Sequence, residues 1–225
     1  MKKNLLQLNT SLYSESGQSS RLANELVAAW IARNAGASVT TRDLARNPVP
    51  HLTAERFQAF ITQPEERTPA QRAVIAESDA LVDELARADA IVLGLPLYNF
   101  GVPSTLKAYF DHVARAGVTF TYTAQGPVGL LTGKKAYVIA TRGGLYAGTP
   151  GDTQTAYVRQ FLGFLGITDV EFVYAEGLAI SEESKTAAIA RAQQAIGRID
   201  EAATARLNET ATARLGEAVP ERIAA

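Results

Sequence analysis

The stretch LPLYNFGVPS, residues 95–104, contains the loop that decides the fold class of this chain. An apolar run at residues 89–94 precedes it and predicts a buried parallel strand, and residues 103–111 predict a helix. The loop therefore lies at the carboxyl end of a strand, where open α/β sheets bind their ligands. It offers an aromatic ring, an amide side chain and backbone polar groups, which suit a flat heterocycle better than a phosphate or a metal. The alternative interpretation is an ordinary turn framed by prolines.

Strands and helices alternate along the rest of the chain. We expect strands at residues 4–10, 38–44, 90–95, 135–141 and 170–175, and a short hairpin arm at residues 119–123. We expect helices at residues 18–34, 53–61, 69–88, 104–115, 153–165 and from residue 182 onward. This alternation predicts a parallel, doubly wound sheet. The tail after residue 190 is rich in Ala, Arg and Glu and predicts one long or two short surface helices, either passive or used in assembly.

Length, charge and composition exclude several classes of protein. The chain has 225 residues, 47% of them hydrophobic and 20% charged, which is typical of one large soluble α/β domain. A net charge of −1 gives no basic field for nucleic acid or an anionic membrane. Because there is no cysteine, disulfides, thiolate catalysis and Cys-ligated metals are excluded. His51 and His112 lack carboxylate clusters at ligand spacing, so we expect no metal site.

The amino-terminal sequence shows no targeting signal. Residues 1–4 lead directly into the first expected strand, without the apolar core of a signal peptide. No segment approaches the length that spans a bilayer, and we therefore expect a cytoplasmic protein that does not enter the membrane.

A serine-rich loop, SLYSESGQSS at residues 11–20, connects the first strand to its helix. Hydroxyl and backbone N–H groups gather there at a helix N-terminus, where unpaired N–H groups and the helix dipole favour an anion. The loop matches neither G-x-G-x-x-G nor a P-loop, which argues against a pyrophosphate and allows a phosphate monoester. The alternative is plain capping of the helix by serines.

A third loop, TRGGLY at residues 141–146, follows the strand at residues 135–141. Paired glycines allow a ligand to approach the backbone closely. The three loops follow strands whose carboxyl ends meet at one edge of the sheet, so we expect them to converge on one crevice. One loop offers a seat for a phosphate and two can frame a flat ring. Riboflavin phosphate (FMN) is the mononucleotide that fits them best.

Together these motifs resemble the FMN-dependent NADH azoreductase and NAD(P)H:quinone reductase family, whose members have a flavodoxin-like fold. The matching elements, in order, are the serine-rich loop, PLYNF at 96–100, GVTF at 117–120, TGKK at 132–135, TRGG at 141–144 and FLGFLGI at 161–167. The resemblance implies a five-stranded parallel sheet in the order 2-1-3-4-5 with helices on both faces. The resemblance runs from about residue 4 to residue 177. We expect an FMN-binding domain over residues 1–190, with residues 191–225, which exceed the usual length of the family, as a helical extension of the same domain.

The resemblance implies which residues of this chain bind the cofactor, because they stand at the matching positions of the family's motifs. Those at the phosphate are Ser11, Gly17, Gln18 and Ser19. Those around the ring are Leu97, Tyr98, Asn99, Phe100, Thr141, Arg142, Gly143 and Gly144. The family has serine where this chain has Gly17, so either the phosphate is bound less tightly or Ser16 substitutes. Arg142 either approaches the carbonyl edge of the flavin or anchors its own loop.

The resemblance also implies a substrate pocket that crosses a subunit boundary. Its aromatic walls would be Tyr122, Tyr146 and Phe164. The alternative places Tyr122 and Phe164 in the core. We expect Lys107 and Asp111 to orient or cap their helix, and His112 to lie on a helix surface rather than to donate a proton.

The implied protein is a homodimeric FMN-dependent oxidoreductase with one FMN per subunit. It would use NADH or NADPH to reduce quinones by two electrons and to cleave aromatic azo compounds to amines. Hydride would pass through flavin N5 in a ping-pong sequence, with no catalytic side chain required. Two alternatives stay open: a flavodoxin-like electron carrier, and a flavin reductase that releases reduced FMN. The near-neutral charge and the long helices between residues 53 and 88 argue against the carrier.

Overall fold

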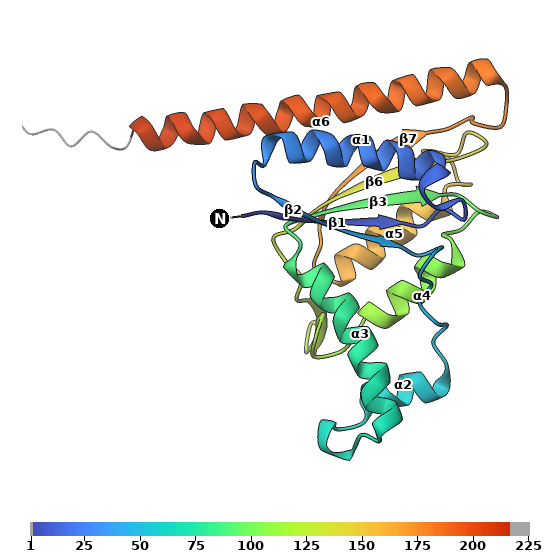
Figure 1. The fold of residues 1–225 in the computed structure, drawn as a ribbon, viewed down its shortest axis with the longest axis vertical. Coiled ribbons are helices and arrows are strands. Elements are labelled where there is room, and N and C mark those ends of the chain that lie inside the picture. Colours follow the sequence, from blue (N-terminus) through green and yellow to red (C-terminus); the bar gives the residue numbers. More distant parts are fainter. Residues whose placement is uncertain (1, 217–225) are drawn as a thin grey trace, which may run out of the picture.

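A five-stranded parallel sheet forms the centre of the molecule (Figure 1). The computed structural model describes residues 2–216, and their side chains as far as residue 199. The strands lie in the order β2 (Ser38–Asp43), β1 (Asn4–Asn9), β3 (Ala90–Pro96), β6 (Lys135–Thr141) and β7 (Asp169–Ala175). This confirms the predicted order 2-1-3-4-5, because β6 and β7 are the fourth and fifth strands of the sheet along the chain. The strands β4 (Phe120–Thr123) and β5 (Gly126–Gly129) form a separate hairpin. The sequence indicated only the first arm of that hairpin.

The central strands are apolar and buried, as is typical of a parallel sheet that is covered on both faces. Every residue of β3 is buried. Leu93 of β3 pairs with Leu8 of β1 on one side and with Val138 of β6 on the other, and all three are buried. Because the five strands are parallel, their carboxyl ends meet at one edge, on the right of the sheet in Figure 1.

Helices pack against both faces of the sheet (Figure 1). The helices are α1 (Gln18–Arg33), α2 (Ala54–Ile61), α3 (Pro69–Arg87), α4 (Ser104–Val113), α5 (Thr153–Phe164) and α6 (Glu182–Gly216), with short 3-10 turns at Ser14–Ser16 and Pro64–Glu66. Leu22 of α1 and Ile196 of α6 pack on one face. Leu81, Tyr109 and Leu162, from α3, α4 and α5, pack on the other. The α2 helix lies beside α3, and both project away from the sheet in Figure 1.

The helices α3 and α1 begin in different ways. At α3 the side chain of Thr68 accepts from the N–H of Gln71 (3.2 Å), and the Gln71 side chain accepts from the N–H of Thr68 (2.9 Å), a complete capping box. At α1 the preceding residue is Gly17, which has no side chain with which to cap. The first-turn N–H groups of α1 are therefore left for another partner.

A glycine in β3 brings this open helix end close to the sheet. A Cβ atom built on Gly94 would lie 3.2 Å from the carbonyl oxygen of Ser19 in the first turn of α1. The hydroxyl of Thr10 donates to the carbonyl of Gly94 (2.7 Å), which fixes the end of β1 against β3. The serine-rich loop is thus held against the carboxyl end of β3.

The carboxyl-terminal segment forms one helix, which decides between the two predicted arrangements of the tail. The α6 helix runs from Glu182 to Gly216 without a break. Ala192 and Ile196 are buried in the same cluster as α1, so the part of α6 that contains them belongs to the core of the domain. Residues 217–225 of the tail lie outside the described residues.

The predicted surface position of His112 is wrong, because this side chain is fully buried. Its Nε2 lies 3.1 Å from the carbonyl oxygen of Pro50, and its ring packs edge-on against Phe60 at 5.8 Å between centroids. The loop before α2 and α2 itself cover the helix face that periodicity alone leaves exposed. Burial lowers the pKa of His112, and the charge of Arg56 lowers it further.

Candidate functional site

The serine-rich loop and the start of α1 bring buried hydroxyl groups and helix N–H groups together, and we call this cluster the anion seat. Ser11 is buried at the end of the loop, and the hydroxyls of Ser19 and Ser20 are buried in the first turn of α1. Neither hydroxyl has a hydrogen-bond partner among the residues that the structure describes. Buried polar groups are normally paired, so two orphan hydroxyls beside free helix N–H groups indicate an absent polar ligand.

Gly17 has a steric role in this seat. A Cβ atom at residue 17 would lie 2.1 Å from Oγ and 2.6 Å from Cβ of Ser11, so the Ser11 side chain fills the space that a serine at 17 would take. Ser16 is exposed, and its hydroxyl donates to the carbonyl of Tyr13 (2.8 Å). The hydroxyl of Ser14 donates to the carboxylate of Asp43 at the end of β2. The Ser11 side chain, rather than that of Ser16, therefore lies against the Cα atom of Gly17.

Residues 98–101, which we call the ring-side turn, form a tight hairpin directly after β3. The N–H of Tyr98 donates to the carbonyl of Gly101 (3.3 Å), and the N–H of Gly101 donates to the carbonyl of Tyr98 (3.0 Å). Between them Asn99 and Phe100 have φ angles of 49° and 63°. Two successive non-glycine residues in the left-handed region are uncommon, and such strain gathers at functional sites. The Tyr98 hydroxyl accepts from the N–H of Leu12 (3.3 Å), which joins this turn to the serine-rich loop.

The loop at residues 141–146, which we call the glycine loop, lies beside the ring-side turn at the same edge of the sheet. The N–H of Leu97 donates to the carbonyl of Thr141 (2.9 Å), so the loops after β3 and β6 begin side by side. The ring of Tyr146 folds over Gly144, where an added Cβ would lie 2.9 Å from the ring. Tyr146 also packs edge-on against Phe100, with centroids 5.8 Å apart. The two loops therefore meet through these aromatic rings.

The Arg142 side chain is fully buried and anchors the glycine loop. Its guanidinium contacts Asp152 (2.8 Å), Glu176 (3.0 Å) and the hydroxyl of Thr155 (2.9 Å), and it lies 5.1 Å from the ring centroid of Tyr174. Burial opposes ionisation of Asp152, but hydrogen bonds from Arg142 and Thr155 outweigh it and hold the pKa of this carboxyl below its usual range. Of the two roles considered for Arg142, the structure shows the anchoring one.

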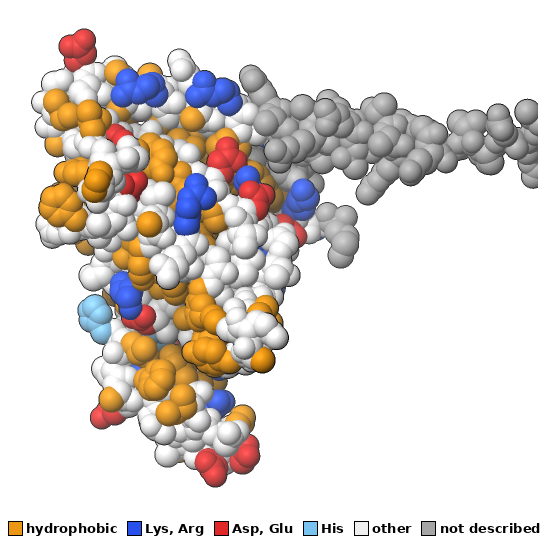
Figure 2. Space-filling view, turned by 180° about the vertical axis from the view of Figure 1, so that it is seen from behind, with side chains coloured by type: hydrophobic (Ala, Val, Ile, Leu, Met, Phe, Trp, Pro, Cys, Tyr) orange, Lys and Arg blue, Asp and Glu red, His pale blue; other side chains and the backbone are white. Residues whose placement is uncertain are grey.

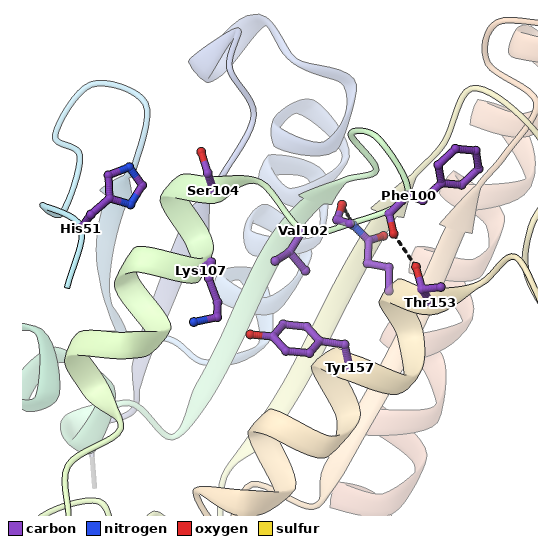
Figure 3. A pocket seen from close by; sticks show the side chains of 9 residues that line it. His51, Phe100, Val102, Ser104, Lys107, Thr153 and Tyr157 are labelled. Atoms are coloured by element: carbon purple, nitrogen blue, oxygen red, sulfur yellow. Dashed lines mark hydrogen bonds between the residues drawn. The ribbon is translucent and has the colours of Figure 1, made fainter. Parts of the chain in front are cut away.

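A pocket of about 510 Å³ opens beside the ring-side turn, between the first turns of α4 and α5 (Figure 3). It is lined by His51, Phe100, Gly101, Val102, Ser104, Lys107, Thr153, Gln154 and Tyr157. Lys107 forms an ion pair with Asp111, one turn further along α4 (2.7 Å). Burial raises the pKa of Tyr157, so this residue faces the pocket as a neutral hydroxyl group. The pocket is large enough for one small aromatic molecule beside the ring-side turn.

The three residues predicted to line a substrate pocket do not meet within one chain. Tyr146 lies beside the start of α5, whereas Phe164 is its last residue, and a helix of 12 residues is about 18 Å long. Tyr122 lies with Phe164, because both contact Phe120, at centroid distances of 5.4 Å and 4.3 Å. Tyr122 is 72% exposed, so it is not a core residue.

The described part of the chain contains no group of three or more His, Asp or Glu side chains that could hold a metal ion. Nor does any described helix combine the length and hydrophobicity needed to cross a membrane.

The chain is similar to proteins of known name. The model of a family with a flavodoxin-like fold matches residues 3–199. The chain is 54% identical over 187 residues to an FMN-dependent NADH:quinone oxidoreductase of Cellvibrio japonicus, covering 83% of this chain and 94% of that protein. A Burkholderia lata protein named FMN-dependent NADH:quinone oxidoreductase 6 is 53% identical, over 85% of this chain and 97% of its own length.

The fold of the chain is also similar to that of solved azoreductase structures. A crystal structure of an azoreductase from Bacillus anthracis superposes with a TM-score of 0.80 at 27% identity, over 89% of this chain and 99% of that one. An FMN-dependent NADH-azoreductase of the same species, solved in complex with FMN, has a TM-score of 0.78 at 26% identity, over 88% of this chain and all of that one.

Proposed function

The chain belongs to the flavodoxin-like family that includes the FMN-dependent NADH:quinone oxidoreductases, and we propose from this that it is an FMN-dependent oxidoreductase acting on quinones and aromatic azo compounds. The electron donor is NADH or NADPH. One observation carries the proposal: the anion seat, the ring-side turn and the glycine loop contact one another at the carboxyl edge of the sheet, where we propose that they surround one crevice. A mononucleotide with a flat ring matches that set of groups.

The residues present fit the phosphate of FMN. Ser11, Gly17, Gln18 and Ser19 would hold it at the open N-terminus of α1. The orphan hydroxyl of Ser19 and the uncapped N–H groups would then have partners, and the helix dipole would favour the negative charge. Because Ser11 fills the space at Gly17, we propose that its hydroxyl compensates for the missing serine.

The residues present also fit the ring. Leu97, Tyr98, Asn99 and Phe100 would approach it from one side, and Thr141, Gly143 and Gly144 from the other. Arg142 would act through the loop that it anchors and not through its guanidinium, which is committed to Asp152 and Glu176. Leu12, Phe100 and Leu145 are 62%, 62% and 65% exposed at this edge, and such exposed apolar groups would shield a bound ring from water.

Bound FMN would supply hydride transfer from the nicotinamide to the acceptor through its N5 position. The protein groups at the crevice are a phenol, an amide, backbone groups and apolar side chains, which bind and orient planar molecules. Donor and acceptor both need the apolar space beside Phe100 and Tyr146. We therefore expect each to exclude the other, which gives ping-pong kinetics.

We also propose that the protein is a homodimer in which each chain completes the other's substrate pocket. Tyr122 and Phe164 lie at the far end of α5 from Tyr146, so they can line a common pocket only if they come from a second chain. Phe57 and Ile61 of α2 are 51% and 57% exposed, and Figure 2 shows clusters of hydrophobic side chains along one face of the molecule. Light scattering should give the mass of two 24.0 kDa chains, and a fully active monomer would reject the dimer.

Steady-state kinetics test the activity. The rate should be measured with NADH varied at several fixed quinone concentrations, and then with an azo dye in place of the quinone. We expect parallel double-reciprocal lines, one NADH consumed for each quinone and two for each azo dye. Intersecting lines would contradict the shared crevice, and absence of turnover with both acceptors would contradict the function.

A further inference from the structure

We propose that Gln154, together with its neighbour Thr153, is a positioning residue that holds the ring-side turn in the shape that binds the flavin ring. Both residues lie in the first turn of α5, and nothing in the sequence motifs pointed to them. The inference rests on the proposed function, because it concerns how this chain holds FMN.

Gln154 ties the two ends of the ring-side turn together. Its side chain is buried, and its amide nitrogen donates both to the carbonyl of Pro96 (3.0 Å), just before the turn, and to the carbonyl of Gly101 (3.2 Å), at its end. The hydroxyl of Thr153 donates to the carbonyl of Phe100 in the middle of the turn (Figure 3). Three carbonyl groups in and beside the turn are thus bound by two consecutive side chains of α5.

The ring-side turn needs such support because its backbone is unfavourable by itself. Asn99 and Phe100 both have positive φ angles, which residues other than glycine rarely adopt. Within the turn, two backbone hydrogen bonds join Tyr98 and Gly101, and one of them is long, at 3.3 Å. A strained turn persists only where its surroundings hold it, and here those surroundings are the side chains of Thr153 and Gln154.

The same end of α5 is fixed to the glycine loop. Asp152, which precedes Thr153, accepts from the N–H of Thr155 (3.0 Å) and from the guanidinium of Arg142 (2.8 Å). The start of α5 therefore connects the ring-side turn to the glycine loop, and both loops would approach the flavin ring. A shift of Gln154 would alter the spacing between the two.

The chemistry of Gln154 indicates that its amide group is present for its donor contacts. Its carbonyl oxygen is buried and has no hydrogen-bond partner among the described residues. A buried unpaired oxygen destabilises the fold, and an apolar residue of the same size would avoid it. The hydrogen bonds that the amide nitrogen donates to the backbone in and beside the ring-side turn therefore explain why an amide is present at this position.

Matched variants of the full-length chain test the inference. Gln154→Met keeps the length of the side chain and removes the amide, Thr153→Val removes the hydroxyl, and Thr153→Ser retains it. Val158→Ala is the control, because Val158 is a fully buried residue of α5 that belongs to the hydrophobic core and not to the contacts with the ring-side turn. For each protein we would measure the Kd for FMN by fluorescence quenching, the visible circular dichroism of bound FMN, and Tm without FMN.

We expect Gln154→Met to raise the Kd for FMN by about tenfold, because it removes the amide donor that the carbonyls of Pro96 and Gly101 share. We expect it also to weaken the circular dichroism of the flavin at saturation. Thr153→Val should raise the Kd and Thr153→Ser should match the wild type. Val158→Ala should lower Tm and leave the Kd and the dichroism unchanged.

Unchanged Kd and dichroism in Gln154→Met would overturn the inference. It would also be overturned if Val158→Ala, which only destabilises the core, raised the Kd for FMN as much as Gln154→Met does. If Gln154→Met fails to fold, the Thr153 pair decides, and equal Kd values for Val and Ser at residue 153 would overturn it. A wild-type chain that binds no FMN would refute the proposed function itself, and the inference with it.

Discussion

Replacing Arg142 by methionine should destabilise the protein strongly, because its side chain holds a buried network. The guanidinium is fully buried, and its partners Asp152 and Glu176 are only 7% and 14% exposed. Arg142→Met removes the ion pairs with both carboxylates and the hydrogen bond to Thr155. Removing one partner of a buried ion pair typically costs about 3–5 kcal/mol, and we expect the free energy of unfolding to fall by that amount.

Urea denaturation of the wild type, Arg142→Met, Asp152→Asn and the double variant measures this effect. For a chain of this size the loss corresponds to roughly 6–20 °C in Tm. The double variant should lose less than the sum of the single variants, because each single change leaves the same interaction broken. A loss below about 1 kcal/mol in Arg142→Met would refute the anchoring role, since that is what an exposed ion pair is worth. The guanidinium would then be available to the flavin.

Three further predictions concern the anion seat and the junction with α2. Ser19→Ala should raise the Kd for FMN about ten- to a hundredfold, the worth of one hydrogen bond to a charged group, and an unchanged Kd would place the phosphate elsewhere. Gly17→Ala should lower the free energy of unfolding by about 1–3 kcal/mol by its clash with Ser11, and Ser11→Gly added to it should restore stability in the same urea titration. The pKa of His112 is lowered in the folded state, so its contribution is complete above the unfolded pKa of about 6.5 and is lost as the pH falls. His112→Gln should therefore lose less stability than the wild type between about pH 7.5 and pH 5, and equal losses would show that His112 does not cause the dependence.

The sequence predicted the sheet and the three loops because each depends on local signals. The apolar run of β3, the prolines around the ring-side turn and the paired glycines after β6 are all visible within a few residues. The side-chain roles at the site were harder to predict. Arg142 could be assigned only after Asp152 and Glu176 were known to surround it, and these residues lie 10 and 34 positions away.

The same limit explains the residues that the sequence missed. His112 is buried by Pro50 and Phe60, which precede it by more than 50 residues, so helical periodicity could not reveal it. Gln154 carries no motif, and its importance comes from two backbone carbonyls on another segment. A partial signal did exist, because α5 starts at the sheet edge where the predicted loops converge.

Anaerobic spectroscopy of the flavin-loaded protein tests the central claim most directly. The full-length chain is loaded with FMN and freed of excess, one equivalent of NADH is added, and then one equivalent of a quinone. We predict about one FMN per chain, loss of the visible flavin absorbance with NADH, and its full return with the quinone while FMN stays bound. A chain that retains no FMN, or a bound flavin that NADH does not bleach, would contradict the account.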